Sequence, residues 1–446
     1  MPGREGAGPG GTASGGTGGT GGTGGPGITA VGGVGGEAAG GPDHGGVGGE
    51  AGGGPDHGGV PARAGRPGRG LTAYLLHPRP DAWAKALLAP ACFILAAIST
   101  GAFAAWARFV ILWLVFELLI YPARYQWNDV RGIDADRRHP EGRARSRLPA
   151  GATPQARRRS IRLSVAAAAL RIVAALLIGI AAGLLRPVLL LTGAVFVIAG
   201  CYEYLRALPG RHSRAPASVQ AVAVWLAVGL GYLVRGGLGL ASARLSWASV
   251  AMVAGLACVA AFGIMFVLLT WALEATSYCA ADGGGWHARA DLAGKPHLAV
   301  LLRHLRVPVQ RDGAGPVPDG SCANQPVLRL GARLTAPWNL ALGGAGAFGT
   351  IQGLALAGPA RDNPGWYLGV AALALAGAGL LARCRSQRLR WVVTGIWAPL
   401  LVAAALPAGP ARPLLVGLPW LVTGGVYTAF CGWSYRDLLT MGPGQA

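Results

Sequence analysis

The feature that most restricts the fold is a succession of apolar segments, which fills most of the chain after Arg79-Pro80. Hydrophobic residues make up 52% of the 446 residues, and charged residues only 13%. Soluble domains usually carry about 25% charged residues, and about 20 consecutive apolar residues span the hydrocarbon core of a bilayer. The sequence therefore predicts an all-α bundle of about 9–10 transmembrane helices, with the lipid bilayer as its partner.

The connections between these segments predict the topology. We expect apolar helices near residues 84–101, 104–125, 163–185, 187–205, 217–240, 247–273, 337–359, 366–382, 391–407 and 413–433. Arginines are concentrated before the first segment and in four alternate connections, 131–162, 206–214, 289–333 and 383–390. Because cytoplasmic loops carry an excess of Lys and Arg, we expect an integral multi-pass membrane protein with these connections and both termini in the cytoplasm.

The net charge of +20 would suggest a nucleic-acid partner in a soluble protein. Here the basic residues lie in short loops between apolar segments, where they orient the helices, so we expect no nucleic-acid partner. The seven cysteines include no Cys-x-x-Cys pair, and we interpret them as small buried hydrophobic residues.

The N-terminal region has a different composition. Residues 1–72 are rich in glycine and contain a tandem echo, GGEAAGGPDHGGV followed by GGEAGGGPDHGGV. Such a segment cannot bury enough apolar surface to offset its conformational entropy, so we expect a disordered tail. Residues 73–446 then form the membrane domain.

A dense set of charges follows the second apolar segment, between Asn128 and Gly151. Carboxylates such as those of Asp129, Asp134 and Asp136 are hard ligands for a divalent cation, and Mg²⁺ held by few carboxylates completes its shell with water and substrate phosphate. The arginines that follow have forked donors that match phosphate oxygens; they are Arg137, Arg138, Arg143, Arg145 and Arg147. A positive-inside loop would also explain the arginines, but it leaves the carboxylates unexplained.

The second segment also places polar residues on one helical face. Glu117, Tyr121, Arg124 and Asn128 are separated by four, three and four positions. A carboxylate inside a membrane usually faces the bundle interior or a watery cavity, so Glu117 is a candidate functional residue. The alternative is that Glu117 is a structural partner of Arg124 or of an arginine on another helix.

The sixth segment ends in a second acidic region. Trp271, Glu274, Tyr278 and Asp282 have helical spacing and predict one polar face. Asp291 and Lys295 come next, as candidate contacts to metal or diphosphate; a solvated loop of mixed charge is the alternative. Residues 297–305 read as an amphipathic helix lying on the membrane surface.

These residues also carry a resemblance to the UbiA superfamily of intramembrane prenyltransferases, best over residues 79–300. Its first signature, N-D-x-x-D-x-x-x-D, is similar to this chain at Asn128, Asp129 and Asp136, and glycine stands at the middle acidic position, 132. We expected Asp134 to substitute for that acid in a non-helical turn.

Further stretches also resemble the superfamily. They are Leu148-Pro149-Ala150-Gly151, the end of the fourth segment at Tyr202, and the glycine-rich stretch around Arg235. A membrane-embedded cation such as Arg235 needs an anion, which is either Glu117 or a diphosphate.

The resemblance implies an enzyme that uses Mg²⁺ to ionise a polyprenyl diphosphate and transfers the prenyl group to an acceptor, with its active site toward the cytoplasm. It implies catalytic roles for Asn128, Asp129 and Asp136; Glu117 joins these catalytic candidates because of its depth in the membrane. The implied substrate contacts are Arg137, Arg143, Arg147, Arg235, Lys295 and Tyr202. The implied metal ligands are Asp129, Asp134, Asp136, Asp282 and Asp291.

Two alternatives remain open at this point. A terpene cyclase would ionise geranylgeranyl or farnesyl diphosphate without an acceptor, since the cation can be attacked by its own double bonds. A non-catalytic lipid-binding or transport protein would fit the glycine at position 132 and the irregular second acidic region.

Overall fold

The computed structural model describes residues 70–76, 83–137, 139, 148–149, 153–208, 217–282, 285–288, 292, 295–305, 324, 326, 332–358 and 364–440, and the account below concerns these residues. Its α-helices are α1 (Leu71–Leu76), α2 (Trp83–Ala86), α3 (Leu88–Thr100), α4 (Trp106–Leu114), α5 (Tyr121–Arg137), α7 (Pro154–Ala181), α8 (Leu185–Ala207), α9 (Ala217–Ser242), α10 (Val250–Thr276), α11 (Pro296–Leu302), α13 (Pro337–Leu356), α14 (Pro364–Arg383), α15 (Gln387–Ala405), α16 (Leu414–Cys431) and α17 (Tyr435–Thr440). Short 3₁₀ turns, η2 (Ala102–Ala105) and η7 (Leu406–Ala408), and a π-helical turn, η3 (Val115–Ile120), complete the helices. One antiparallel hairpin pairs β1 (Cys279–Asp282) with β2 (Gly285–Ala288).

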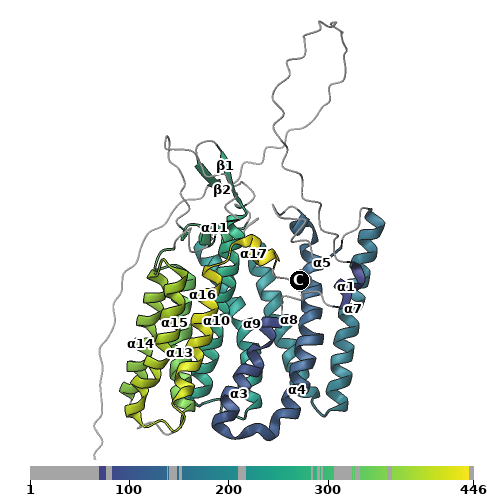
Figure 1. Cartoon of the computed structure of the whole chain (residues 1–446). Helices are drawn as coiled ribbons and strands as arrows, with labels where there is room; N and C mark the ends of the chain where they lie inside the picture. Colours follow the sequence, from purple (N-terminus) through teal and green to yellow (C-terminus); the bar gives the residue numbers. More distant parts are fainter. Residues whose placement is uncertain are drawn as a thin grey trace, which may run out of the picture. The chain divides into compact units, whose positions relative to one another are not determined.

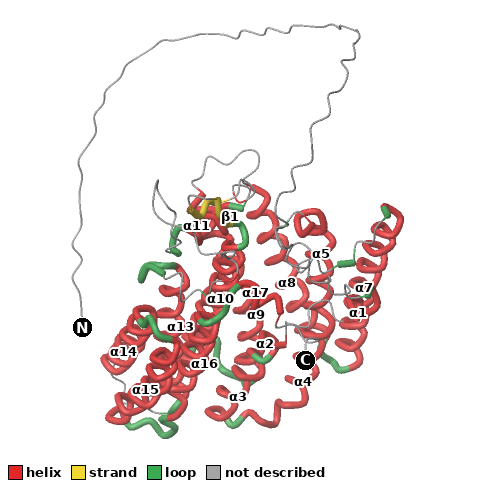
Figure 2. Tube along the Cα trace, turned by 45° about the horizontal axis from the view of Figure 1, so that its top comes forward, coloured by secondary structure: helices red, strands yellow, loops and turns green. Residues whose placement is uncertain are grey.

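The described chain is a bundle of apolar helices, and Figure 2 shows the hairpin as a small exception beside α11. Eight of the described helices are long and apolar enough to cross a membrane, the first running from η2 through α4 and η3 into α5. The expected polytopic membrane bundle is confirmed at this level. Of the predicted tail, residues 1–69 lie outside the described residues, and Leu71 and Thr72 belong to α1.

Two predicted segments differ from the other spans. Helix α3 is apolar but has only 13 residues. Helix α13 has 20 residues, yet it does not reach the apolar character of the eight spans, because glycine, Asn339 and Gln352 interrupt its apolar residues. It packs against α10, α14 and α16, and most of its side chains are buried there. Protein, rather than lipid, therefore surrounds much of α13.

Two cores hold the bundle together, and α10 contributes to both. One core joins α3, α4, η3, α5, α7, α8 and α9 with α10, and the other joins α10 with α11 and helices α13 to α17. Glycine allows close approach in the first core: a Cβ at Gly239 of α9 would collide with the carbonyl oxygen of Ala89 in α3. The glycine-rich part of α9 therefore brings two backbones into contact.

The helices alternate in direction, as the arginine pattern predicts. In Figure 1 the carboxyl ends of α5, α8, α10, α14 and α16 lie at the upper end of the bundle, beside α11, α17 and the hairpin. The described arginines at this end include Arg157, Arg158 and Arg159 at the start of α7 and Arg383 at the end of α14. Helix α5, which carries the first acidic motif, and helix α10, which carries Glu274, both finish at this end.

Candidate functional site

The first acidic motif lies on a helix. Residues 121–137 form one continuous α-helix, so the non-helical turn expected around Asp134 is wrong. Asp129 and Asp136 are seven residues apart, about two turns, so they share a face and are separated by about 10 Å along the axis. Gly132 lies near that face, has an ordinary negative φ, and a Cβ there would meet no atom within 4 Å. Its backbone does not require glycine.

Asp134 points elsewhere. Five helical positions after Asp129 place it about 140° around the helix. Both of its carboxylate oxygens accept hydrogen bonds from Nη2 of Arg157, at 2.7 and 2.8 Å, on the exposed surface between α5 and α7. Helical propagation through Gly132 therefore separates Asp134 from the other two acids, and its assignment as a metal ligand stays a prediction.

Asp129 is buried against the N-terminal helix α1. Its side chain is only 3% exposed, and the hydroxyl of Tyr74 donates a hydrogen bond to its Oδ2 at 3.3 Å. The same hydroxyl lies 3.4 Å from Oγ of Ser164 in α7. Arg171 of α7 donates to the carbonyl oxygens of Leu75 and Leu76, which end α1. Helix α1 is thus attached directly to the acidic face of α5.

His139 connects the first motif to the end of α10. It follows α5, is buried, and its Nε2 lies 3.7 Å from Oε1 of Glu274. Its ring contacts the rings of Tyr278 and Tyr435, with centroids 5.1 and 6.0 Å away. The structure therefore brings together the two regions that the sequence identified separately.

The second acidic region is only partly helical. Helix α10 ends at Thr276, so Tyr278 follows it and Asp282 lies in strand β1, which corrects the expected helical face. Lys295 donates a hydrogen bond from Nζ to the hydroxyl of Tyr278. The predictions for Asp291, Arg143 and Arg147, and for the side chains of Asp282 and Arg137, lie outside the described residues.

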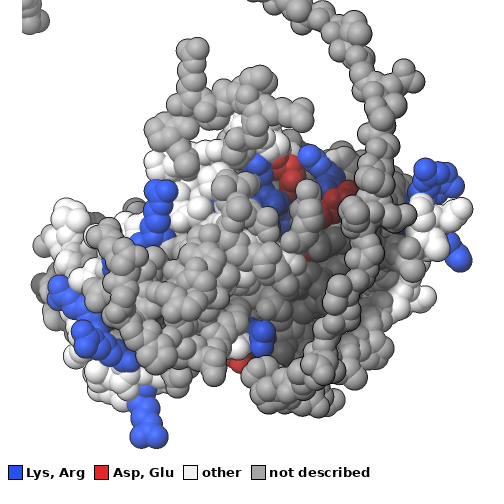
Figure 3. All heavy atoms as spheres, turned by 90° about the horizontal axis from the view of Figure 1, so that it is seen from above, with Lys and Arg blue, Asp and Glu red and all other residues white. Residues whose placement is uncertain are grey.

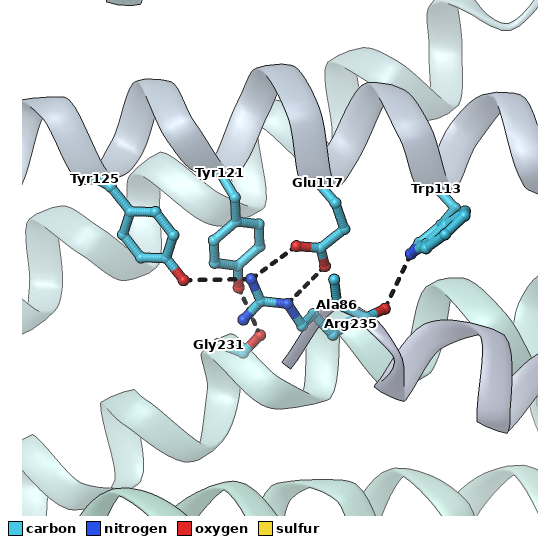
Figure 4. Close-up of polar contacts among 7 residues, drawn as sticks. All are labelled: Ala86, Trp113, Glu117, Tyr121, Tyr125, Gly231 and Arg235. Atoms are coloured by element: carbon cyan, nitrogen blue, oxygen red, sulfur yellow. Dashed lines mark hydrogen bonds and ion pairs between the residues drawn. The ribbon is translucent and has the colours of Figure 1, made fainter. Parts of the chain in front are cut away.

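Glu117 and Arg235 are partners. Nε and Nη2 of Arg235 donate to the two carboxylate oxygens of Glu117 at 2.7 and 3.0 Å (Figure 4). Nη2 also lies 3.4 Å from the hydroxyl of Tyr125, and the guanidinium group stacks 3.5 Å above the ring of Tyr121. Of the alternatives open for Glu117, the structure favours an arginine on another helix over Arg124.

Helical spacing accounts for this convergence, because Glu117, Tyr121 and Tyr125 follow one another at intervals of four residues. A π-helical turn also lies at this point of the chain. Such a turn inserts one extra residue into a helix, and η3 carries Glu117 directly before α5. Glu117, Tyr121 and Tyr125 all face Arg235 of α9, while the hydroxyl of Tyr121 donates to the carbonyl oxygen of Gly231 at 3.0 Å. Figure 4 shows these side chains pointing toward one guanidinium group between two helices.

Tyr202 belongs to an aromatic group beside the second region. Its ring lies 6.2 Å from that of Trp271 in α10, which in turn contacts the ring of His297 at 5.1 Å. His297 is buried because α11 packs against α9 and α10. The buried residues His297, Leu298 and Leu301 of α11 face other helices, so protein covers this side of the helix; its expected position on the membrane surface stays a prediction.

A chain of aromatic rings continues into the bundle. Tyr232 of α9 contacts Phe262 and Phe266 of α10, and Phe266 contacts Phe430 of α16, with centroids 4.9–6.4 Å apart. Nζ of Lys85 lies 5.3 Å from the centre of the Phe266 ring. Only Phe262 and Phe266 have helical spacing, on α10; no spacing rule relates them to Lys85, Tyr232 or Phe430, which come from other helices.

Further along, His304 follows α11. Its ring contacts Trp338 edge to face at 6.2 Å, and its buried Nδ1 has no hydrogen-bond partner among the described atoms. Burial, reinforced by the positive charge of Arg333, lowers the pKa of His304 below its ordinary value of 6.5. This imidazole is therefore held in its neutral form.

The donor set limits how a metal would bind. Within the described ranges no group of three His, Cys, Asp or Glu side chains is placed to hold a metal ion. Asp129 and Asp136 are too far apart along α5 to share one Mg²⁺ with bonds of about 2.1 Å. A Mg²⁺ ion held by only one of these carboxylates would need water and substrate phosphates to complete its shell.

Acidic, basic and aromatic side chains therefore meet at the upper end of the bundle. Figure 3, which looks onto this end, shows Asp and Glu side chains directly beside Lys and Arg side chains. Asn128, which is half-buried in α5, lies at the same end. Such a set can bind a charged group while an apolar chain extends among the helices. Comparison of the chain with protein-family models, curated proteins and solved structures finds no match.

Proposed function

We propose that the chain is an intramembrane prenyltransferase, which ionises a polyprenyl diphosphate and transfers the prenyl group to an acceptor. The observation that carries the proposal is the contact between the two charged regions. His139, just after the acidic face of α5, lies against Glu274 and Tyr278 at the end of α10, and Tyr278 contacts Lys295.

The charges at this site suit a diphosphate. Asp129 and Asp136 are the carboxylates that would hold Mg²⁺, which supplies positive charge to neutralise the departing diphosphate. Lys295 provides a point charge for phosphate oxygens from the other side. Fixed charges aimed at the leaving group stabilise the transition state more than the ground state.

The membrane bundle suits the prenyl chain. Phe266 contacts both Phe262 and Phe430 between the helices, and the faces of such rings attract cations. An apolar, aromatic wall also keeps water away from an allylic cation. The arginine-rich end carries the proposed site, so we place that site toward the cytoplasm.

The Glu117–Arg235 pair supports this arrangement from a distance. Because Arg235 is already bonded at two points to Glu117, we assign it to positioning α5 against α9. Asn128 and Asp129 lie about three turns after Glu117 in the same continuous helix. When the ion pair holds η3 in place, it therefore also sets the position of these two residues along the helix axis, relative to α10.

The test uses the full-length protein in membranes, incubated with geranylgeranyl diphosphate and Mg²⁺. The expected result is release of pyrophosphate that requires Mg²⁺ and rises with a suitable acceptor. Release without acceptor, together with a hydrocarbon product, would assign a terpene cyclase instead. Binding of the diphosphate without any release, over a panel of donors and acceptors, would contradict an enzyme and favour a lipid-binding protein.

A further inference from the structure

A second site is suggested on the opposite flank of the α10–α13 core. An apolar cavity of about 450 Å³ lies between α13 and α14. Small residues, including Gly343 and Gly379, provide its space, and Leu340 and Leu375 form part of its wall. Those two leucines are 64% and 51% exposed, so the cavity opens on the surface of the bundle. In a membrane, lipid chains lie against such a surface.

A cluster of arginines stands at one end of this cavity. Arg383 lines it directly; Arg385 follows in the turn after α14, and Arg388 and Arg390 lie in the first turn of α15. Among the described residues, none of these four arginines has an ion-pair partner. Along the margin of Figure 3 where α14 and α15 lie, Lys and Arg side chains stand without Asp or Glu beside them.

Arg390 shows that the positive charge extends inward. It is only 6% exposed, and its Nε donates to the carbonyl oxygen of Cys384 at 3.0 Å. Its Nη1 is buried and has no hydrogen-bond partner in the described part of the chain. The Arg390 guanidinium group also lies 5.6 Å from the centre of the Tyr427 ring, but no described carboxylate pairs with it. A buried charge without a counter-charge is costly, so an anion close to this arginine would be stabilising.

The orientation of the helices in the membrane does not by itself explain why an apolar groove and a group of arginines lie together. Arginines in a cytoplasmic connection orient the helices wherever they stand in it. An apolar groove that ends at Arg383, two residues before Arg385 in the chain, is an additional feature, and basic pockets between transmembrane helices bind anionic lipid head groups. We propose that this groove binds an anionic phospholipid, with its phosphate against Arg383, Arg385 and Arg388 and one acyl chain between α13 and α14.

This proposal is independent of the prenyltransferase assignment, because none of the residues proposed to hold the diphosphate lines the groove. It concerns a structural or regulatory lipid rather than a substrate. Its test therefore measures binding and needs no turnover.

The experiment titrates the purified full-length chain in detergent with dioleoylphosphatidylglycerol or with dioleoylphosphatidylcholine, and counts bound lipids by native mass spectrometry. The expected result is a single phosphatidylglycerol that binds at least about tenfold more tightly than phosphatidylcholine. The head-group variant changes Arg383, Arg385 and Arg388 together to Gln, and it should abolish that preference.

A second variant tests the chain-binding part. Gly379→Leu fills the groove, and a Cβ at this position meets no atom within 4 Å, so the helix tolerates the change. It should weaken phosphatidylglycerol binding about tenfold. Gly369→Leu, on the same helix and with equally open surroundings, is the matched control and should bind normally. A triple Gln variant of the exposed Arg108, Arg186 and Arg244 controls for net charge.

Four results would overturn the proposal. Equal binding of both lipids would show that the arginines select nothing. Equal losses in the two arginine triple variants would assign the effect to net charge, and normal binding by Gly379→Leu would show that no acyl chain uses the groove. A dimer without bound lipid would assign the groove to a second copy of the chain.

Discussion

Glu117 and Arg235 form a two-point ion pair inside the membrane bundle, with both guanidinium donors on the two oxygens of one carboxylate. Arg235 is 2% exposed and also stacks on Tyr121. Removal of one member of a buried pair leaves the other charge without compensation, which is far more costly than the pair's net contribution.

Glu117→Gln should therefore lower the free energy of unfolding by about 3–5 kcal/mol. Denaturant unfolding of the protein in detergent measures this loss. The control is Glu203→Gln, which breaks the more exposed pair of Glu203 and Arg206 at 3.4 Å and should cost less than about 1 kcal/mol. Similar losses for the two variants would contradict the structural role of the buried pair.

The double variant Glu117→Leu with Arg235→Met separates structure from catalysis. Replacing both charges by apolar groups removes the uncompensated charge, so stability should return toward that of the unmodified protein. If this stable variant releases pyrophosphate normally, the pair positions the helices only. If it folds but is inactive, the catalytic assignment of Glu117 is supported.

Asp129→Ala should reduce turnover more than about tenfold, which corresponds to about 1.4 kcal/mol of lost transition-state stabilisation. Asp134→Ala is the matched control on the same helix, because its carboxylate is bonded to Arg157 on the exposed surface. It should keep nearly normal turnover and Mg²⁺ dependence. If it were as damaging as Asp129→Ala, Asp134 would serve the metal after all.

Gly132→Asp should strengthen metal binding. A Cβ at Gly132 meets no atom within 4 Å, so the carboxylate would be accommodated. It would stand three residues after Asp129 and four before Asp136, and side chains at these spacings are neighbours on a helix. The concentration of Mg²⁺ that gives half-maximal pyrophosphate release should fall, whereas Gly132→Asn should change it less. An unchanged value for the Asp variant would place the ion away from this face.

Tyr74→Phe should raise the Mg²⁺ requirement without unfolding the protein. The hydroxyl of Tyr74 donates to Asp129, and loss of such a group behind a metal ligand typically weakens metal binding about 10–100-fold. Tyr427→Phe, which removes a hydroxyl bonded to Asn339 at 2.8 Å in the other core, provides the comparison. It should affect stability alone. Equal Mg²⁺ curves for the two variants would exclude a role for Tyr74 at the metal.

Acidification should destabilise the region around His304. Burial lowers the folded-state pKa of His304 below its ordinary value of 6.5, so the unfolded state binds the proton more readily. The neutral imidazole's contribution to stability is therefore complete above that ordinary value and is lost as the pH falls below it. Thermal unfolding at about pH 7.5 and about pH 5.5 measures the loss, which should be smaller in His304→Phe. An equal loss in that variant would assign the pH dependence to other groups.

The apolar helices could be predicted because hydropathy over about 20 residues reflects the bilayer itself. Each expected apolar segment overlaps a described helix, and their alternation follows the arginines. The wrong prediction was the local backbone conformation near the first acidic motif. Asp134 was expected in a turn, but α5 continues without interruption through Gly132 to Arg137.

The partners of the site residues depended on contacts between distant segments. Tyr74 on Asp129, and His139 on Glu274, join residues that no spacing rule relates. The sequence limited the anion of Arg235 to two candidates, and only the packing of η3 against α9 selects Glu117. For α11 the amphipathic pattern was real, but it reports burial of one face without saying whether lipid or protein covers it.

Helix α13 has a consequence for how the chain is made. An insertion machinery that samples one segment at a time retains those that prefer lipid to water, and α13 is less apolar than the eight spans. Its neighbour α10 is already synthesised when α13 emerges, whereas α14 and α16 come later. Biogenesis therefore has to deliver α13 into the bilayer together with its partners, so a nascent chain that stops after Leu356 should leave this segment only partly integrated.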